Sequence, residues 1–200
     1  MILTKYAPIK VKYGLGIIEH DAEGRILTLE FPTFFIVWVY TPHLMVDWSR
    51  IEYRIFEWDV AVREHCEKLR STGKYVIVAG DFNVCHEPID IHNPEKSEWG
   101  AGYTFYERTS FSKLLQSGFT DTYRLLNPDT ANYTWWSSRG NNLRNKNLGR
   151  RYDYILIDDR IKDSVIQSDI YNHIKGSDHC PIMSTIDLNI VKAIQEKQWL

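Results

Sequence analysis

Residues 75–91 read YVIVAGDFNVCHEPIDI, and this stretch joins a hydrophobic run to a polar turn. The run Tyr75–Val78 predicts a buried strand, which ends by presenting Asp81 and Asn83. Alternate residues of a strand face the same side, so these two side chains share a face, and Gly80 permits close approach of other atoms to the backbone. A carboxylate beside a neutral amide suits a hard cation or a phosphate-bound water. The alternative interpretation is an Asx turn that only closes the strand.

The composition indicates one globular domain with a packed core. The chain has 200 residues, of which 44% are hydrophobic and 14% aromatic. Its net charge of −2 provides no global attraction to nucleic acid, so any such binding requires a local basic patch. We predict a domain over residues 1–189 and a C-terminal tail over 190–200.

The chain shows no membrane or secretion signal. The longest strongly apolar run, Phe34–Tyr40, is far too short to span a membrane, and the first residues lack the apolar core of a signal peptide. The cysteines, Cys66, Cys85 and Cys180, are odd in number and have no metal-binding spacing, so we expect reduced thiols. An intracellular location, cytoplasmic or nuclear, is therefore predicted.

The periodicity of the apolar residues predicts strands with intervening helices. The run FFIVWVY, residues 34–40, is interpreted as a central strand covered on both faces. Ser49 and Glu52 fit a capping box, and an apolar stripe at spacings of three and four then continues to Leu69. Gly73 ends this helix. Further strands are expected at 26–29, 133–136, 152–157, 165–170 and 182–188, with a short helix at 111–115 and a helical tail from Val191. The pattern indicates a layered α/β or α+β domain.

Other polar side chains also stand at the edges of hydrophobic strands. Tyr40 ends one strand, Asp153 opens another, and Asp178 with His179 precedes the last. In a layered sheet these edges can converge with Asp81 on one side of the molecule. Carboxylates, an amide and a histidine without a cysteine cluster suit Mg²⁺ and phosphodiester hydrolysis. Taken singly, each of these residues has a structural alternative. In these alternatives, Asp153 forms an ion pair with Arg151, Asp178 is a turn residue, and His179 is a hydrogen-bonded core histidine.

A basic loop follows two tryptophans. Residues 139–151 read RGNNLRNKNLGRR and contain no acidic residue, and Trp135 and Trp136 stand just before them. A nucleic-acid surface typically combines cations, which bind phosphates, with flat rings, which contact a base or the gap left at a sugar without a base. The alternative is a solvated loop beside two core tryptophans.

Seven segments of the chain resemble those of a known family. In order, PIKVKYGLGIIEHDAEGR, VYTPH, RIEYRIFEWD, VAGDFNVCHEPIDIHNP, NYTWW, RNKNLGRRYDY and GSDHCPI are similar to segments of the exonuclease III / abasic-site endonuclease branch of the endonuclease–exonuclease–phosphatase superfamily, especially its human-type members. The resemblance implies a four-layer α/β sandwich, in which two facing sheets have helices outside. It also implies Mg²⁺-dependent (or Mn²⁺-dependent) cleavage of double-stranded DNA 5′ to an abasic site, with 3′–5′ exonuclease and 3′-phosphodiesterase activity.

The resemblance carries roles to matching residues. Asp81 would position or deprotonate the attacking water, Asn83 would hold the phosphate, and His179, oriented by Asp153, would contact it together with Tyr40. The implied metal ligands are Asp178, Asp81 and Asn83. The implied DNA contacts are Arg144, Lys146, Asn147, Arg151 and His43, and the implied abasic pocket consists of Trp135, Arg150 and Tyr152.

The chain departs from the family pattern in several places. His43 replaces an Asn or Gln, the surroundings of Val46 lack an Arg that human-type members insert into DNA, and Arg150 replaces a pocket tryptophan. The family's opening strands, with an Asn and a metal-binding Glu, have no counterpart, so the sandwich is expected to be incomplete at its N-terminus. Three explanations stay open: a fragment or truncated product of an active enzyme, half of a split enzyme that a second polypeptide completes, or a remnant that binds DNA without cutting it. A lipid or inositol phosphatase is disfavoured, because PIDIHNP and RNKNLGRRYDY match the DNA-repair branch.

Overall fold

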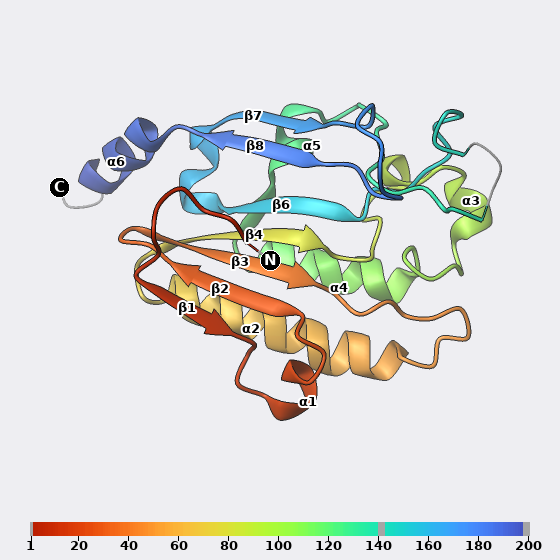
Figure 1. The fold of residues 1–200 in the computed structure, drawn as a ribbon, viewed down its shortest axis with the longest axis horizontal. Coiled ribbons are helices and arrows are strands. Elements are labelled where there is room, and N and C mark those ends of the chain that lie inside the picture. Colours follow the sequence, from red (N-terminus) through yellow and green to blue (C-terminus); the bar gives the residue numbers. More distant parts are fainter. Residues whose placement is uncertain (1, 140–142, 198–200) are drawn as a thin grey trace.

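The computed structural model describes residues 2–139 and 143–197, which form two β-sheets with flanking helices (Figure 1). The large sheet has the order β1-β2-β3-β4-β6-β5, and β7 pairs with β8 in a second sheet. The strands are β1 (Lys10–Tyr13), β2 (Ile26–Glu30), β3 (Phe34–Tyr40), β4 (Tyr75–Asp81), β5 (Phe119–Asp121), β6 (Asp153–Asp158), β7 (Val165–Ile170) and β8 (Ile182–Ile186). The helices are α1 (Ile18–Asp21), η1 (Tyr53–Trp58), α2 (Asp59–Arg70), η2 (Pro88–Asp90), α3 (Pro94–Ser97), α4 (Phe105–Gln116), α5 (Thr122–Leu126), η3 (Asp159–Ser164) and α6 (Leu188–Lys197).

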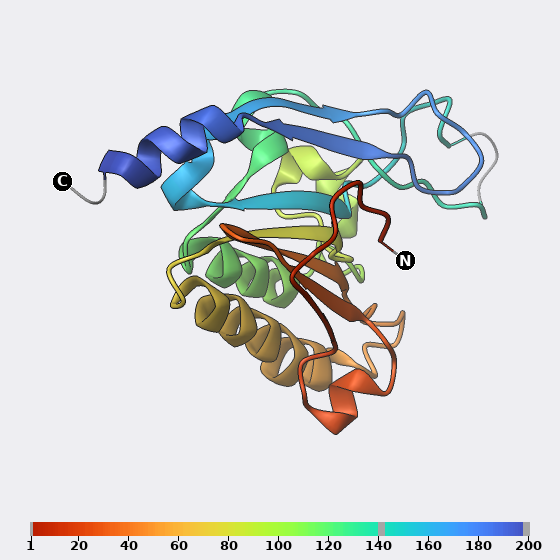
Figure 2. The same ribbon diagram turned by 60° about the vertical axis from the view of Figure 1, so that its left-hand side comes forward.

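The two sheets form the predicted α/β sandwich. On one face of the large sheet, Val37 and Val78 pack with Val62 of α2 and Phe111 of α4 in one core cluster. The other face opposes β7 and β8, as the turned view in Figure 2 shows. Between the sheets lies a cavity of about 290 Å³, lined by residues of both, including Ile155 of β6 and Ile182 of β8.

The register of the large sheet places the polar strand ends side by side. β3 runs parallel to β4 with Tyr40 paired to Asp81, and β4 runs antiparallel to β6 with Asp81 paired to Asp153. Neighbouring strands are about 4.8 Å apart, so the three residues form one row at the rim of the sheet. The predicted convergence of strand ends is therefore confirmed for these residues.

Gly80 is required at the end of β4. Its φ angle is 145°, and a Cβ atom built on it would lie 1.9 Å from the carbonyl oxygen of Val39. A side chain at this position would push β3 and β4 apart directly beside Asp81. The predicted close approach of another backbone is confirmed.

The prediction that β3 is covered on both faces is wrong. Val37 and Val39 are fully buried, but Trp38 is 40% and Tyr40 50% exposed on the opposite face. A continuous apolar run resembles a doubly covered strand, yet the aromatic residues at its end face the rim of the sheet, where Tyr40 borders a cleft.

Two local expectations are also corrected. The backbone N–H of Ser49 donates to Asp47, and no capping contact joins Ser49 to Glu52 among the described residues. A capping box instead begins α4, where Thr104 and Glu107 bond reciprocally. The predicted strand at 133–136 contains only isolated bridges made by Trp135.

The remaining strand predictions agree with β2, β4, β6, β7 and β8 to within a few residues, and the tail is helical from Leu188. All three cysteines are free and buried. In the part of the chain that the structure describes, the helices are all too short or too polar to cross a membrane.

We expect acidification to destabilise the fold through His65. This α2 side chain contacts the hydroxyl of Thr28 at 2.9 Å, and burial, with the charges of Lys12 and Lys68, lowers the pKa of His65 from 6.5 to about 4. The unfolded chain therefore binds more protons between these pH values, and the unfolding free energy falls as the pH drops through this window. The whole shift corresponds to about 3 kcal/mol, which partial exposure reduces to about 1–2 kcal/mol.

Urea unfolding of the protein at pH 7 and pH 4.5 measures this loss. His65→Gln keeps a polar group near Thr28 but cannot gain the proton, so its stability should fall less between the two pH values. An equal fall in both proteins would exclude His65 as the cause.

Candidate active site

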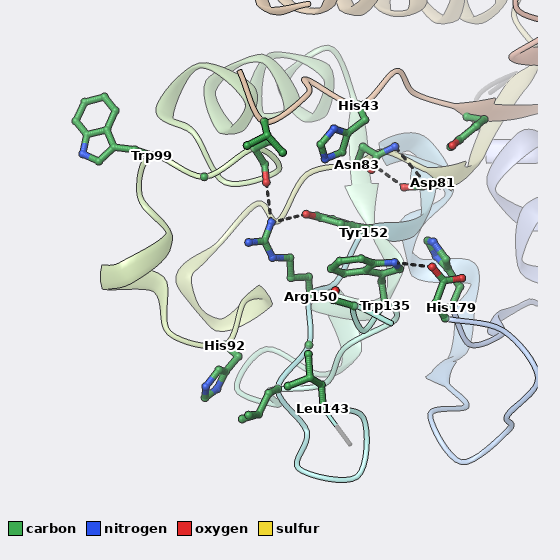
Figure 3. Close-up of a pocket in the computed structure, with 18 residues that line it drawn as sticks. His43, Asp81, Asn83, His92, Trp99, Trp135, Leu143, Arg150, Tyr152 and His179 are labelled. Atoms are coloured by element: carbon green, nitrogen blue, oxygen red, sulfur yellow. Dashed lines mark hydrogen bonds between the residues drawn. The ribbon is translucent and has the colours of Figure 1, made fainter. Parts of the chain in front are cut away.

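The polar strand ends open into a cleft of about 860 Å³ (Figure 3). Its residues come from the ends of β3 and β4 and from the loops that precede α4, β6 and β8. They include Tyr40, His43, Asp81, Asn83, His92, Trp99, Trp135, Arg150, Tyr152, Asp178 and His179. Residues that are far apart in the sequence therefore share one site.

A histidine–aspartate pair lies on one wall of the cleft. His179 Nδ1 is 2.7 Å from Asp153 Oδ2, which leaves the other ring nitrogen free to face the cleft. Burial disfavours the charged imidazolium, but the hydrogen bond to Asp153 and the nearby carboxylates of Asp81 and Asp178 together raise the pKa of His179 above 6.5. The pair suits a protonated histidine that donates to an anion.

Asp81 and Asn83 form the second pair. The backbone N–H of Asn83 donates to Asp81 Oδ1 at 2.8 Å, so an Asx-type turn does close the strand. Burial, reinforced by the charge of Asp153, raises the pKa of Asp81 from 3.8 to about 7. A carboxyl group with a pKa near neutrality is suited to accept a proton from water. The turn and the functional interpretation are therefore compatible.

The amide of Asn83 is engaged by the protein. Its Nδ2 donates to the carbonyl oxygen of Thr41 at 2.9 Å and lies 3.4 Å from Asp81 Oδ2. With both donors directed at these oxygens, Asn83 holds Asp81 and ties β4 to the end of β3. Phosphate binding by its N–H groups, as the resemblance implied, does not fit this arrangement.

Asp178 lies at the mouth of the cleft. Its carboxylate accepts hydrogen bonds from Trp135 Nε1 at 3.1 Å and from the hydroxyl of Ser177 at 3.2 Å. Within residues 2–139 and 143–197, no three His, Cys, Asp or Glu side chains cluster as a metal site. Mg²⁺, however, keeps several waters and needs only one or two carboxylates, and Asp178 and Asp81 fit that requirement.

Tyr40 completes the row of strand ends. Its side chain is half exposed and borders the cleft, and the guanidinium of Arg25 lies 4.6 Å from the centre of its ring. The ring of Tyr40 is therefore held by Arg25, and its hydroxyl has no hydrogen-bond partner among the described residues.

The three residues predicted to line an abasic pocket do line the cleft. The rings of Trp135 and Tyr152 are stacked with centroids 5.3 Å apart, and Arg150 Nη1 donates to the Tyr152 hydroxyl at 2.6 Å. Trp136, by contrast, is a buried core residue, as one alternative proposed.

The predicted DNA-binding residues separate into different environments. Lys146 and Asn147 are exposed, and His43 lines the cleft. Arg144 donates to the carbonyl oxygens of Asn172, Ile174 and Ser177, so it fastens the loop before β8.

The environment of Arg151 contradicts its predicted role. It is only 1% exposed, and its guanidinium pairs with Asp90 at 2.8 Å and with Asp121 at 2.7 Å. The prediction that Arg151 contacts DNA is therefore wrong, because the side chain is enclosed in the core.

Sequence reasoning missed the residue that joins the loops of the site. Arg54 is 2% exposed and donates to the carbonyl oxygens of Pro42 at 2.8 Å and of Phe82 at 2.9 Å, so it links the ends of β3 and β4. An arginine within the apolar stripe of a helix was the available signal. The sequence contains no comparable signal for His92 and Trp99, which line the outer end of the cleft.

Fold and cleft together define an α/β sandwich with carboxylates, an amide and a histidine at one rim, a class of site suited to hydrolysing phosphate esters. The chain belongs to the Endonuclease/Exonuclease/phosphatase family, whose sequence profile matches residues 1–179. The resemblance to the exonuclease III / abasic-site endonuclease branch is also confirmed by individual relatives.

One relative is a DNA-(apurinic or apyrimidinic site) endonuclease of Dictyostelium discoideum, which is 44% identical over 191 residues. These cover 94% of this chain and 52% of that protein, so the chain spans about half the length of this relative. An exodeoxyribonuclease of Bacillus subtilis is 38% identical, with 94% and 73% covered. The solved structure of an AP endonuclease from Archaeoglobus fulgidus superposes with a TM-score of 0.80 at 26% identity and covers 90% of this chain and 71% of that one.

Proposed function

We propose that this protein hydrolyses the phosphodiester bond 5′ to an abasic site in double-stranded DNA. The observation that carries the proposal is the pairing of Asp153 with His179 beside the Asp81–Asn83 pair in one cleft. The named activities of the Dictyostelium and Bacillus relatives support it. Exonuclease and 3′-phosphodiesterase activities belong to the same proposal.

His179 binds the scissile phosphate. Asp153 holds Nδ1, so the other ring nitrogen carries its proton into the cleft and donates to a phosphate oxygen. Such a donor stabilises the charge that develops on phosphorus oxygens in the transition state. Tyr40 lies at the end of β3, beside Asp81, and its hydroxyl donates to the same phosphate.

Asp81 activates the water. Its buried carboxylate accepts the water proton as the oxygen attacks phosphorus, and Asn83 keeps the carboxylate in place. The P–O bond to the upstream 3′ oxygen breaks, and that oxygen takes a proton from solvent water and leaves as a hydroxyl group. In this mechanism, Asn83 is a positioning residue.

Asp178, Asp81 and the amide oxygen of Asn83 would hold Mg²⁺. When bound, the ion would neutralise phosphate oxygens of the substrate. Mn²⁺ has similar oxygen preferences and is expected to substitute. An intracellular location and a second polypeptide that completes the sandwich stay predictions.

A duplex with one tetrahydrofuran abasic analogue tests the proposal. Incision is scored with Mg²⁺, with EDTA and with Asp81→Ala, and we expect cutting only by the wild type with Mg²⁺. A folded protein that binds the duplex but does not cut it would favour the DNA-binding remnant. Faster hydrolysis of a phosphoinositide would move the proposal to a lipid phosphatase.

We expect Lys146 to contribute a phosphate contact. It is exposed on the basic loop, and each neutralised phosphate adds about 0.9 to the slope of log K against log salt concentration. Lys146→Ala should lower this slope by about 1 in a fluorescence anisotropy titration over several salt concentrations. Lys113→Ala, on the outer helix α4, is the matched control and should leave the slope unchanged. Equal slopes for Lys146→Ala and the wild type would remove the loop from the interface.

A further inference from the structure

An exposed tryptophan stands at the outer end of the cleft. Trp99 lines the cleft, yet 71% of its surface is exposed. Tryptophan is highly buried on average, because its ring is the largest apolar side chain. Figure 3 shows Trp99 and His179 on opposite sides of Arg150. The proposed catalytic groups belong to the His179 end, so none of their roles accounts for this open ring.

A second tryptophan supports the ring of Trp99. Trp48 lies in the loop between β3 and η1, and its indole is stacked with that of Trp99, with ring centroids 6.3 Å apart and an angle of 23° between the planes. The φ angle of Trp48 is 59°, in the left-handed region that favours glycine. A side chain persists in this conformation only where the surrounding structure enforces it. The loop therefore keeps a strained backbone at the residue that carries the supporting indole.

The segment that carries Trp99 is anchored to the floor of the cleft. The carbonyl oxygen of Ala101 accepts a hydrogen bond from Arg150 Nη1 at 2.6 Å. The backbone N–H of Gly100 donates to the carbonyl oxygen of Ser97 at 2.7 Å, which closes the turn that presents the ring. The position of Trp99 relative to the cleft is thus set before any ligand arrives.

The charges around Trp99 favour a neutral ligand. Glu95 and Glu98 are exposed in the same segment, and Lys96 is the one cation in residues 94–100. The basic loop 139–151, in contrast, contains no acidic residue. Phosphates are therefore drawn to that loop, whereas a flat apolar ring beside two carboxylates suits the face of a nucleobase.

Only an unpaired base can offer its face to this ring. In a duplex, both faces of each base are covered by its neighbours, and unstacking is costly, least so for a base that is already unpaired. An abasic site removes one stacking neighbour of the adjacent base. If that adjacent base also lacks a pairing partner, it is free to turn onto the indole.

We propose that Trp99, supported by Trp48, is a stacking platform for an unpaired nucleobase next to the abasic site. The inference rests on the proposed function, which places the scissile phosphate at the His179 end of the cleft. The ligand class is a DNA strand whose base beside the lesion is unpaired, with purines preferred because their ring system is larger. Loss of one such stacking contact typically lowers affinity about tenfold.

Fluorescence anisotropy in EDTA, where no cutting is expected, measures the base contact. Two labelled duplexes carry one tetrahydrofuran analogue, and the adjacent nucleotide, which faces a second analogue in the other strand, is either adenine or a third analogue. The two ligands have equal charge and differ in one unpaired base. We expect the wild type to bind the adenine-containing duplex about tenfold more tightly. The pair is made for the 5′ and the 3′ side of the lesion, and the preference is expected on one of them.

Three substitutions assign the preference to the ring. Trp99→Ala should bring the affinity ratio close to one, and Trp99→Phe, which keeps a smaller ring, should retain part of it. Phe56→Ala is the matched control, because Phe56 is 69% exposed on η1 and does not line the cleft. Trp48→Gly removes the supporting ring and relieves the left-handed backbone, so the ratio should fall without a loss of stability in urea unfolding.

The outcomes separate this inference from the proposed function. A preference that Trp99→Ala abolishes, without incision of either duplex in Mg²⁺, would overturn the proposed reaction but not the stacking site. Incision with a wild-type ratio near one would overturn the role of Trp99 alone, as would a preference that Trp99→Ala retains. A protein that binds neither duplex would overturn both. If Trp99→Ala does not fold, the wild-type ratio and Trp99→Phe decide.

Discussion

His179→Ala should lower the rate constant for incision of an abasic duplex by about 10²–10⁴-fold. The structure gives the imidazole a carboxylate partner at 2.7 Å and places it beside Asp81 and Asp178, so its proton is directed at the cleft. Alanine removes the donor without disturbing a buried side chain, because His179 is partly exposed. Affinity for the uncut duplex in EDTA should change by no more than about threefold, because the donor acts mainly in the transition state.

Asp153→Asn distinguishes a catalytic pair from two independent residues. Asparagine keeps the size of the side chain but removes the charge that raises the pKa of His179. We expect an activity loss of the same order, and little further loss in the double variant, because residues that act as a unit are not additive. Single-turnover rates of the four proteins measure this coupling. Losses that multiply in the double variant would contradict the pair, as would cutting by His179→Ala at the wild-type rate.

The strand ends of the site were predictable from the sequence because each follows a simple rule. A hydrophobic run that stops at Gly80 and delivers Asp81 indicates a rim residue, and the register then places Tyr40 and Asp153 beside it. The contact between Asp153 and His179 joins residues 26 positions apart. It was inferred only through the resemblance to the family.

Burial of charged side chains is where sequence reasoning failed. Arg150 and Arg151 are adjacent, and both stand in a basic loop that predicts solvent and DNA contact. Adjacent side chains near the start of a strand face opposite ways, so one lines the cleft and the other enters the core. The acids that neutralise Arg151 are 61 and 30 residues away in the sequence, and no local pattern reveals them.

Arg151→Met should therefore lower the free energy of unfolding by about 3–5 kcal/mol. The arginine donates from Nε and Nη2 to both oxygens of Asp90, at 2.8 and 3.0 Å, and Asp90 is fully buried. Burial opposes the charge of Asp90, yet Arg151 and Arg124 keep its pKa below 3.8, so the carboxylate stays ionised. Without Arg151, this buried charge and that of Asp121 lose their main partner, which costs more than the original pair contributed.

Urea unfolding of Arg151→Met, Asp90→Asn and the double variant measures the effect. The double variant should be less destabilised than the sum of the two single variants, because each single change removes one main partner of the other buried charge. The DNA affinity of the folded fraction of Arg151→Met should keep the wild-type salt slope, whereas Lys146→Ala should show the opposite pattern, with normal stability and a lower slope. A stable Arg151→Met protein with a slope reduced by about 1 would return Arg151 to the DNA interface and would contradict the buried network.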